Sequence, residues 1–156
     1  MQYQNLPRPI ADAHLHFFSH NYFRLLTRQR GFSGSAEEIA DTVSLLGWEA
    51  PAESPVEFAR KWLEEMDRYG VGEAAILASL PGDEDSAIQA AQAYPERLFG
   101  YFFLNPLAEN AVTVLRESLD AGMRGVCLLP AMPRFNLREP RVDEIVKMAA
   151  TKAGTI

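Results

Sequence analysis

Four short apolar segments recur along this chain, and each leads into a polar or proline-containing loop. They cover residues 10–17, 73–79, 98–104 and 124–129, and the last three begin about 25 residues apart. Short continuous apolar runs are typical of strands that are buried on both faces of a parallel sheet. Stretches with helical patterning separate them, and strands that alternate with helices indicate consecutive βαβ units. The pattern therefore predicts an α/β fold.

The clearest predicted helix lies between the first two of these segments. Ser54 to Glu57 has the pattern of a capping box with proline at the first helical position, and Gly70 lies where a C-terminal glycine is expected. Phe58, Trp62 and Met66 recur at four-residue intervals, which gives the helix one apolar stripe. We interpret the stripe as core that packs on the sheet.

Residues 19–53 form an unusually long connection after the first predicted strand. A second capping box, Ser35 to Glu38, predicts a short helix that ends by Gly47. Long insertions after a strand are usually lids or binding loops. The aromatic residues of FFSHNYF (17–23) would then either hold a flat substrate or pack the insertion onto the sheet, and the sequence leaves both open.

Two further helices are expected over 107–121 and 140–153, after which Gly154 would cap the last helix and Thr155–Ile156 would begin another strand. Four strands with covering helices make about half of a (β/α)₈ TIM barrel, which typically needs roughly 250 residues. We predict one partial barrel domain over residues 1–156, the N-terminal half of such a barrel. Its first and fourth strands would have unpaired edges, so we expect a homo-oligomer or a missing C-terminal half.

Composition and charge narrow the classes of function. The 156 residues are 47% hydrophobic with a net charge of −6, and no lysine or arginine cluster favours nucleic acid or an anionic membrane. No apolar run approaches the roughly 20 residues that span a bilayer, and the first residues lack a secretory pattern. The single cysteine, Cys127, cannot form an internal disulfide. We expect a soluble cytoplasmic protein with a small-molecule substrate.

Two of the three histidines lie in the first predicted strand, IADAHLHFF (10–18). Side chains alternate along a strand, so Asp12, His14 and His16 are expected on one face. Imidazoles in this arrangement can share a metal ion such as zinc, and Asp12 could be a further ligand or an outer partner that orients an imidazole. From the pattern alone, two polar residues on an exposed strand or two hydrogen-bonded core histidines remain open.

IADAHLHFF resembles the first strand of the amidohydrolase-related metal-dependent hydrolases, which carries Asp-x-His-x-His. The likeness continues in SPVEFARKWLEEMDRYGVGEAAIL, YPERLFGYFFLNP and AGMRGVCLLP, which are similar to the family's first helix with second strand, its third strand and its fourth strand. The resemblance covers most of the chain, and residues 19–53 are the least similar part. The branch with these features also holds relatives of aminocarboxymuconate-semialdehyde decarboxylase.

The resemblance implies a (β/α)₈ barrel with one divalent metal ion, usually zinc, that activates a water or polarises a substrate group. It makes His14 and His16 the first two ligands and includes Asp12 in the same motif. The family's remaining ligands, on strands five, six and eight, and its catalytic base have no counterparts in this sequence. Binuclear relatives carry a bridging lysine on strand four, and GVCLLP has none, so one metal is implied.

Four hypotheses about function follow from these expectations. The leading hypothesis is a metal-dependent hydrolase of the amidohydrolase type that acts through a metal-activated water, here in a truncated chain with an incomplete site. The alternatives are a metal-dependent non-oxidative decarboxylase of a small carboxylic acid and a non-catalytic half-barrel interaction module. A phosphoesterase similar to histidinol phosphatase ranks last, because it predicts more histidines soon after the first strand and only His20 follows.

Five further residues have candidate roles. Arg134 and Arg138 follow the fourth predicted strand and are candidates for binding a substrate carboxylate. His20 is interpreted as a surface or substrate-loop residue, with a third-ligand role left open. Cys127 is interpreted as an inert buried thiol rather than a nucleophile. Arg124 is expected at the opposite end of the barrel, in a structural ion pair.

Overall fold

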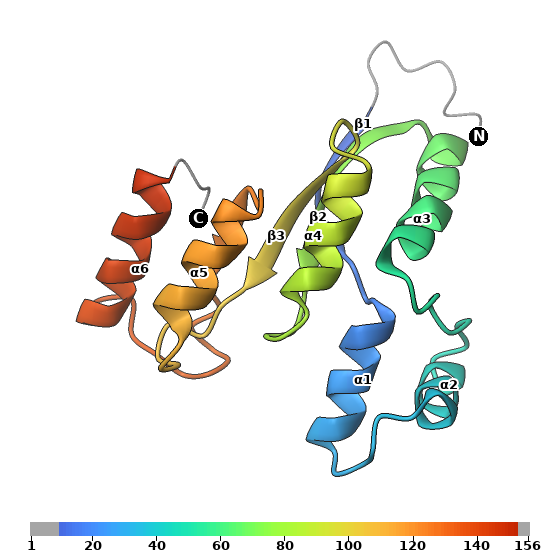
Figure 1. The fold of residues 1–156 in the computed structure, drawn as a ribbon, viewed down its shortest axis with the longest axis horizontal. Coiled ribbons are helices and arrows are strands. Elements are labelled where there is room, and N and C mark those ends of the chain that lie inside the picture. The colour runs from blue at the N-terminus through green and yellow to red at the C-terminus, as the bar shows by residue number, and fades with distance from the viewer. Residues whose placement is uncertain (1–9, 153–156) are drawn as a thin grey trace.

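A computed structural model describes residues 10–152 of the chain, in which four parallel strands form one sheet in sequence order (Figure 1). The strands are β1 (Ile10–His16), β2 (Val71–Ala78), β3 (Leu98–Phe103) and β4 (Gly125–Cys127). The helices are α1 (His20–Gln29), α2 (Ala36–Ser44), α3 (Pro55–Tyr69), α4 (Glu84–Ala93), α5 (Ala111–Asp120) and α6 (Pro140–Thr151). This is the order of half of a (β/α)₈ barrel, as the sequence predicts.

All four predicted strands are present, although β4 is three residues shorter than expected and the helix expected over 107–121 begins only at Ala111. The predicted cap and strand over 154–156 lie outside the described residues. None of the helices within residues 10–152 combines the length and the hydropathy needed to cross a membrane.

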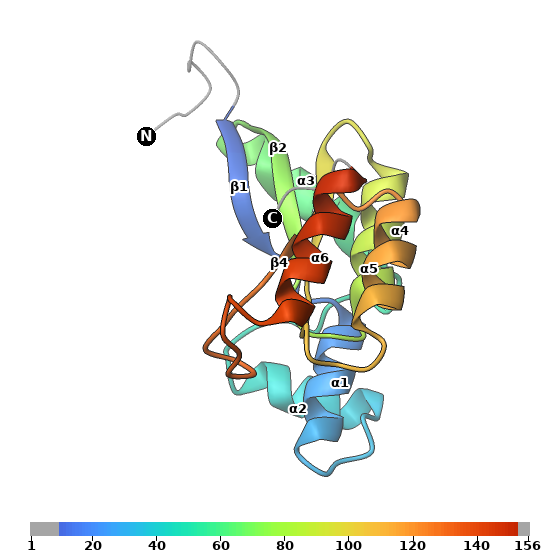
Figure 2. The ribbon, with the colours of Figure 1, turned by 90° about the vertical axis from the view of Figure 1, so that its left-hand side faces the viewer.

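Helices α3 to α6 lie on one side of the sheet (Figures 1 and 2). The strand side chains that face them are almost completely buried, and they are Ala74, Ile76, Ala78, Leu98, Phe102 and Val126. On the opposite face Leu77 is buried, whereas Ala75, Tyr101, Phe103 and Cys127 are only partly buried. The apolar runs on β2 and β3 therefore have one face in the core and one face toward the concave side of the half barrel.

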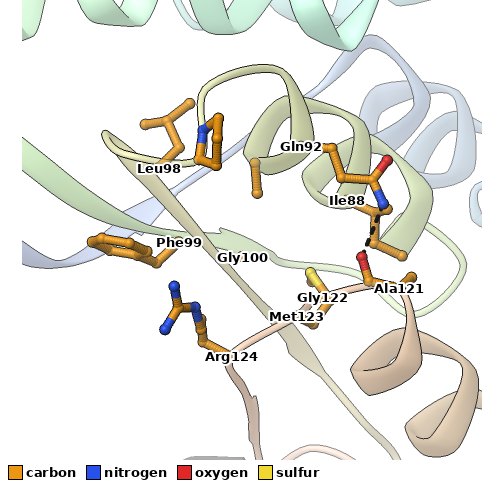
Figure 3. A pocket seen from close by; sticks show the side chains of 11 residues that line it. Ile88, Gln92, Leu98, Phe99, Gly100, Ala121, Gly122, Met123 and Arg124 are labelled. Atoms are coloured by element: carbon orange, nitrogen blue, oxygen red, sulfur yellow. Dashed lines mark hydrogen bonds between the residues drawn. The ribbon is translucent and has the colours of Figure 1, made fainter.

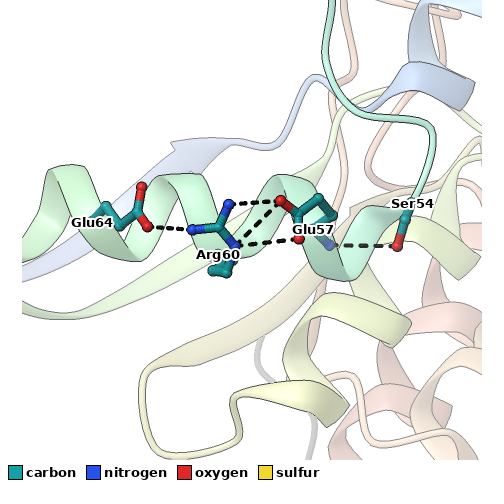
Figure 4. A network of polar contacts seen from close by, with 4 residues as sticks. All are labelled: Ser54, Glu57, Arg60 and Glu64. Atoms are coloured by element: carbon teal, nitrogen blue, oxygen red, sulfur yellow. Dashed lines mark hydrogen bonds and ion pairs between the residues drawn. The ribbon is translucent and has the colours of Figure 1, made fainter.

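Helix α3 begins and ends where the sequence predicts, but only half of the expected capping box forms. The Ser54 hydroxyl accepts a hydrogen bond from the Glu57 main-chain N–H (3.4 Å), and Gly70 ends the helix with a φ of 72°. The Glu57 carboxylate accepts from Arg60 instead of from the Ser54 main chain, and Arg60 also pairs with Glu64 (Figure 4). The Arg60 guanidinium, one turn further along the helix, thus binds the Glu57 carboxylate that would otherwise have completed the capping box.

The insertion over residues 19–53 contains two helices, of which the sequence predicted only α2. Helix α1 is capped by Ser19, whose hydroxyl accepts from the Tyr22 main-chain N–H (2.9 Å). No acidic residue follows in its first turn, so the usual signal for a helix start was missing. The two helices pack on each other around three buried side chains, Phe23, Ile39 and Val43.

The capping box predicted for α2 is complete. The Glu38 carboxylate accepts from the Ser35 main-chain N–H (3.0 Å), while the Ser35 hydroxyl accepts from the Glu38 main-chain N–H (3.3 Å). Bonds from the Ser33 hydroxyl and from the main chain lower the pKa of Glu38 to about 2. Helices α1 and α2 lie beyond the carboxyl ends of the strands, where the insertion was expected to act (Figures 1 and 2).

A cavity of about 160 Å³ lies at the other end of the sheet, between α4, β3 and the loop before β4 (Figure 3). Arg124 lines it, with its guanidinium carbon 5.1 Å from the centre of the Phe99 ring. No ion pair of Arg124 is present within residues 10–152, where its guanidinium contacts an aromatic face, so the expected ion pair stays a prediction. The expected position of Arg124, at the end of the sheet away from the histidines, is confirmed.

We predict that Gly100→Ala destabilises the fold by about 1–3 kcal/mol, because an added methyl group overpacks the core. Such a methyl group would overlap Met123 Sδ, and the Met123 side chain is only 4% exposed (Figure 3). Urea denaturation of Gly100→Ala, Met123→Ala and the double variant measures this effect. The double variant should lose less stability than the two single variants added together, and strict additivity would contradict the proposed overlap.

Candidate metal centre

The first strand presents two histidines side by side at its carboxyl end. Leu15 and Phe17 are buried on the helix side of β1, so the alternating positions of His14 and His16 are exposed on the concave side. The two ring centroids are 4.8 Å apart at an interplanar angle of 74°, and the two Nε2 atoms are 3.2 Å apart. The imidazoles face one another, as alternation along the strand predicts.

The strand is not regular through this region, and Asp12 stabilises the irregularity. Asp12 is paired with Ala74 and Leu15 with Ile76, so β1 has one more residue than β2 over this interval. This is the signature of a β-bulge, a feature common beside functional sites. Asp12 Oδ1 accepts a hydrogen bond from the main-chain N–H of His14 (2.9 Å). The carboxylate thus orients the main chain that carries the histidines and contacts no imidazole.

A residue that the sequence analysis missed contacts His16. Ser79 comes directly after β2, and its Oγ lies 2.7 Å from His16 Nδ1. The available signal was its position, since Ser79 is the first polar residue after a buried strand that is paired with β1. Partial burial, followed by the proximity of His14, lowers the pKa of His16. The imidazole is therefore neutral near pH 7 and can act as a metal ligand.

The spacing of the two imidazoles fits one metal ion. Two nitrogens bound to a single tetrahedral zinc ion, each at about 2.0–2.1 Å, lie about 3.3–3.4 Å apart. The observed separation of the His14 and His16 Nε2 atoms is 3.2 Å. The donor set matches as well, because neutral imidazole suits zinc and several other divalent transition metals. The two histidines can thus supply half of a tetrahedral ligand shell.

No group of three or more histidine, cysteine, aspartate or glutamate side chains within residues 10–152 is placed to hold a metal ion. His20 is the first residue of α1, not a loop residue as expected, and it lines a separate polar cavity with Arg24 and Asp85. Cys127 lies on the concave face of the sheet, where burial raises the pKa of its thiol. The structure therefore brings together the imidazoles of two sequence-predicted candidates, His14 and His16, while Asp12 contacts the main chain of His14.

A cavity of about 410 Å³ adjoins His16, and most of the side chains that line it are aromatic. The Phe18 ring stacks on the His16 ring at 5.2 Å and 18°, and the Trp48 ring from the insertion stacks on Phe18 at 6.0 Å and 22°. Trp62 also lines this cavity, and its Nε1 is buried with no hydrogen-bond partner among the described residues. The FFSHNYF aromatics therefore pack the insertion onto β1 and also form a cavity.

Arg134 and Arg138 lie in the exposed loop between β4 and α6. This loop follows the carboxyl end of β4, and in a parallel sheet it shares that end with the histidines. Both arginines line a shallow hollow that does not include His16. Neither guanidinium has an ion-pair or hydrogen-bond partner in residues 10–152. Their role in binding a substrate carboxylate stays a prediction.

A buried carboxylate attaches the insertion to the rest of the fold. Asp83, which is fully buried, accepts hydrogen bonds from the Ser19 hydroxyl (2.8 and 2.9 Å), the Asn21 amide (2.9 Å) and the Ser86 hydroxyl (2.6 Å). These contacts connect the start of α1 to the start of α4. They fix where the insertion leaves the sheet, directly after the two histidines.

The fold and the site together define a class: half of a (β/α)₈ barrel whose first strand presents paired histidines at its carboxyl end. No protein-family model matches the chain, and no curated protein does.

Two solved structures are similar in fold. One is a 5-carboxyvanillate decarboxylase from Novosphingobium aromaticivorans with bound manganese and 3-methoxy-4-hydroxy-5-nitrobenzoic acid; it shares 18% identity, with a TM-score of 0.64 over 95% of this chain and 49% of that one. The other is a probable 2-pyrone-4,6-dicarboxylic acid hydrolase from Acinetobacter baumannii with bound citric acid; it shares 15% identity, with a TM-score of 0.56 over 91% of this chain and 46% of that one.

These likenesses establish the fold, and this chain spans about half the length of either structure.

Proposed function

We propose that His14 and His16 are two ligands of one divalent metal ion, with zinc as the leading candidate, and that the chain forms part of an amidohydrolase-type hydrolase. The observation that carries this proposal is the 3.2 Å separation of the two Nε2 atoms at the carboxyl end of β1. Active sites of (β/α)₈ barrels lie at that end of the strands. The likeness of IADAHLHFF to the amidohydrolase opening motif supports the same assignment, as do a hydrolase and a manganese-containing enzyme among similar folds.

The metal ion would supply Lewis acidity and would lower the pKa of a bound water. The chain's own residues would hold and orient the reactants. His16 offers a neutral imidazole, Asp12 holds the bulge at His14, and aromatic side chains line the cavity beside His16.

Two ligand positions of a tetrahedral ion would remain for other donors. We propose that a second β/α half, in the same polypeptide or in another chain, supplies them together with the catalytic base. Both similar structures have about twice the length of this chain, which supports this arrangement. Decarboxylation by the same ligands is the alternative reaction. No contact among residues 10–152 favours it over hydrolysis.

Calorimetric titration of the chain with Zn²⁺ and Mn²⁺ tests the proposal. The unmodified chain should bind one ion, and the His14→Ala/His16→Ala double variant should lose more than about 100-fold in affinity, since even outer partners of ligands are worth 10–100-fold. His20→Ala is the matched control, because its imidazole lies in a different cavity, and its affinity should be unchanged. Equal metal affinity of the unmodified chain and the double variant would contradict the proposed metal site. The hypothesis of a non-catalytic half-barrel module would then be favoured.

A further inference from the structure

The contacts of Ser79 carry an inference about how His16 is prepared for its role. Ser79 Oγ lies 2.7 Å from His16 Nδ1 and 3.1 Å from the main-chain carbonyl oxygen of Leu77. Leu77 is the residue of β2 that pairs with His16 in the sheet register. The serine hydroxyl is therefore held between the ring of His16 and the main chain beside it. Ser79 itself is half-buried.

The direction of these hydrogen bonds is limited by a single proton. A serine hydroxyl has one O–H to donate, and a carbonyl oxygen can only accept. When Ser79 donates to the Leu77 carbonyl, its oxygen can accept from His16 Nδ1–H, and both contacts are satisfied. When it donates to His16 Nδ1, the proton of the neutral ring moves to Nε2, and the contact with Leu77 is lost. The first arrangement uses both observed contacts.

The first arrangement also has a consequence for Nε2. In a neutral imidazole only one nitrogen carries a proton, so a proton on Nδ1 leaves His16 Nε2 as a free lone pair. That lone pair faces His14 Nε2 at 3.2 Å, and in the metal-free chain His14 Nε2–H can donate to it. His16 is thus already in the form that binds metal, whereas His14 must move its proton to Nδ1 before it can bind.

We propose that Ser79 is a positioning residue that holds His16 in the Nδ1–H tautomer, with Nε2 directed at the point it shares with His14. Its effect on metal binding rests on the proposed function, but the tautomer of the metal-free ring does not. Outer partners of this kind fix the ring orientation of a ligand, and their loss typically costs about 10–100-fold in metal affinity. Asp12 was expected to be either a metal ligand or an outer partner of this kind, and its carboxylate accepts from the main-chain N–H of His14.

Nitrogen-15 NMR of the histidine side chains in the metal-free chain tests the tautomer directly. We expect His16 to be in the Nδ1–H form and His14 in the Nε2–H form. Ser79→Ala should move His16 toward the Nε2–H form, and Ser79→Thr, which keeps the hydroxyl, should restore it. Ser44→Ala is the control, because that exposed hydroxyl donates to the Asp41 carbonyl within α2. An unmodified His16 in the Nε2–H form, or no change in Ser79→Ala, would overturn the proposal.

The affinity for Zn²⁺ of the same four proteins gives the second measurement. Ser79→Ala should bind Zn²⁺ about 10–100-fold more weakly, and Ser79→Thr should recover most of that loss. Unchanged affinity in Ser79→Ala would overturn the positioning role even if the tautomer shifts. Should the unmodified chain fail to bind Zn²⁺, the proposed function fails, and the NMR measurement still decides whether Ser79 sets the tautomer.

Discussion

Asp83→Ala is expected to destabilise the folded chain by about 1–3 kcal/mol, the cost of leaving buried hydrogen-bonding groups without their partner. The substitution leaves the Ser19 and Ser86 hydroxyls and the Asn21 amide without their shared acceptor. Two of these three side chains are themselves buried, so water cannot fully replace the lost bonds. Urea denaturation followed by circular dichroism measures the change.

The effect of Asp83→Ala should also depend on pH. Burial raises the pKa of Asp83 above its usual range, although the three donors act in the opposite direction. A carboxyl group with a raised folded-state pKa contributes most to stability below its unfolded-state pKa of about 3.9, and loses that contribution as the pH rises through the folded-state value. The destabilisation should therefore be larger near pH 4 than at pH 7. Asp85→Ala, at an exposed position two residues away, is the control and should cost little at either pH.

Phe17→Ala is expected to cost about 3–5 kcal/mol, because it removes a large side chain from the core and leaves a cavity. The Phe17 ring is completely buried and contacts the Phe58 ring of α3, with 5.0 Å between ring centroids. This contact holds the carboxyl end of β1 against the helix layer. Losing it should therefore also weaken metal binding at the adjacent His16.

Phe18→Ala is the matched comparison, since the same side chain is removed one residue later from the opposite side of the strand. Phe18 is only half-buried and stacks on His16 and Trp48. We expect Phe18→Ala to lower the free energy of unfolding by about 1 kcal/mol, because the folded chain buries only part of the apolar area of Phe18. Thermal and urea unfolding of the two variants gives the difference. Equal costs would contradict the assignment of the two faces.

Periodicity was sufficient for the order of the elements but not for their lengths. The apolar runs that became β2 and β3 have one face completely buried and the other partly buried, and such runs are recognisable without tertiary information. Helix α3 was recognisable because Ser54, its apolar stripe and Gly70 mark its start, its face and its end. Helix α1 was not, because its cap at Ser19 interrupts an aromatic segment that is also consistent with a loop.

Capping and ion-pair partners were less predictable, since several groups compete for each side chain. Glu57 had the spacing for a capping box, but its carboxylate pairs with Arg60, one turn further along α3. Arg124 had the position expected for an ion pair, and its guanidinium contacts the Phe99 ring. Spacing along the chain defines which partners are within reach, and the packed structure selects among them.

The sequence by itself determined that the chain is an α/β half barrel and that His14 and His16 share one face of its first strand. Both follow from local rules, namely the alternation of side chains along a strand and the burial of apolar runs. Only the tertiary structure decided what surrounds the pair. It placed Ser79 beside His16, turned Asp12 toward the main chain and kept His20 in another cavity. These contacts join segments distant in sequence or depend on a bulge between paired strands, and no local pattern encodes them.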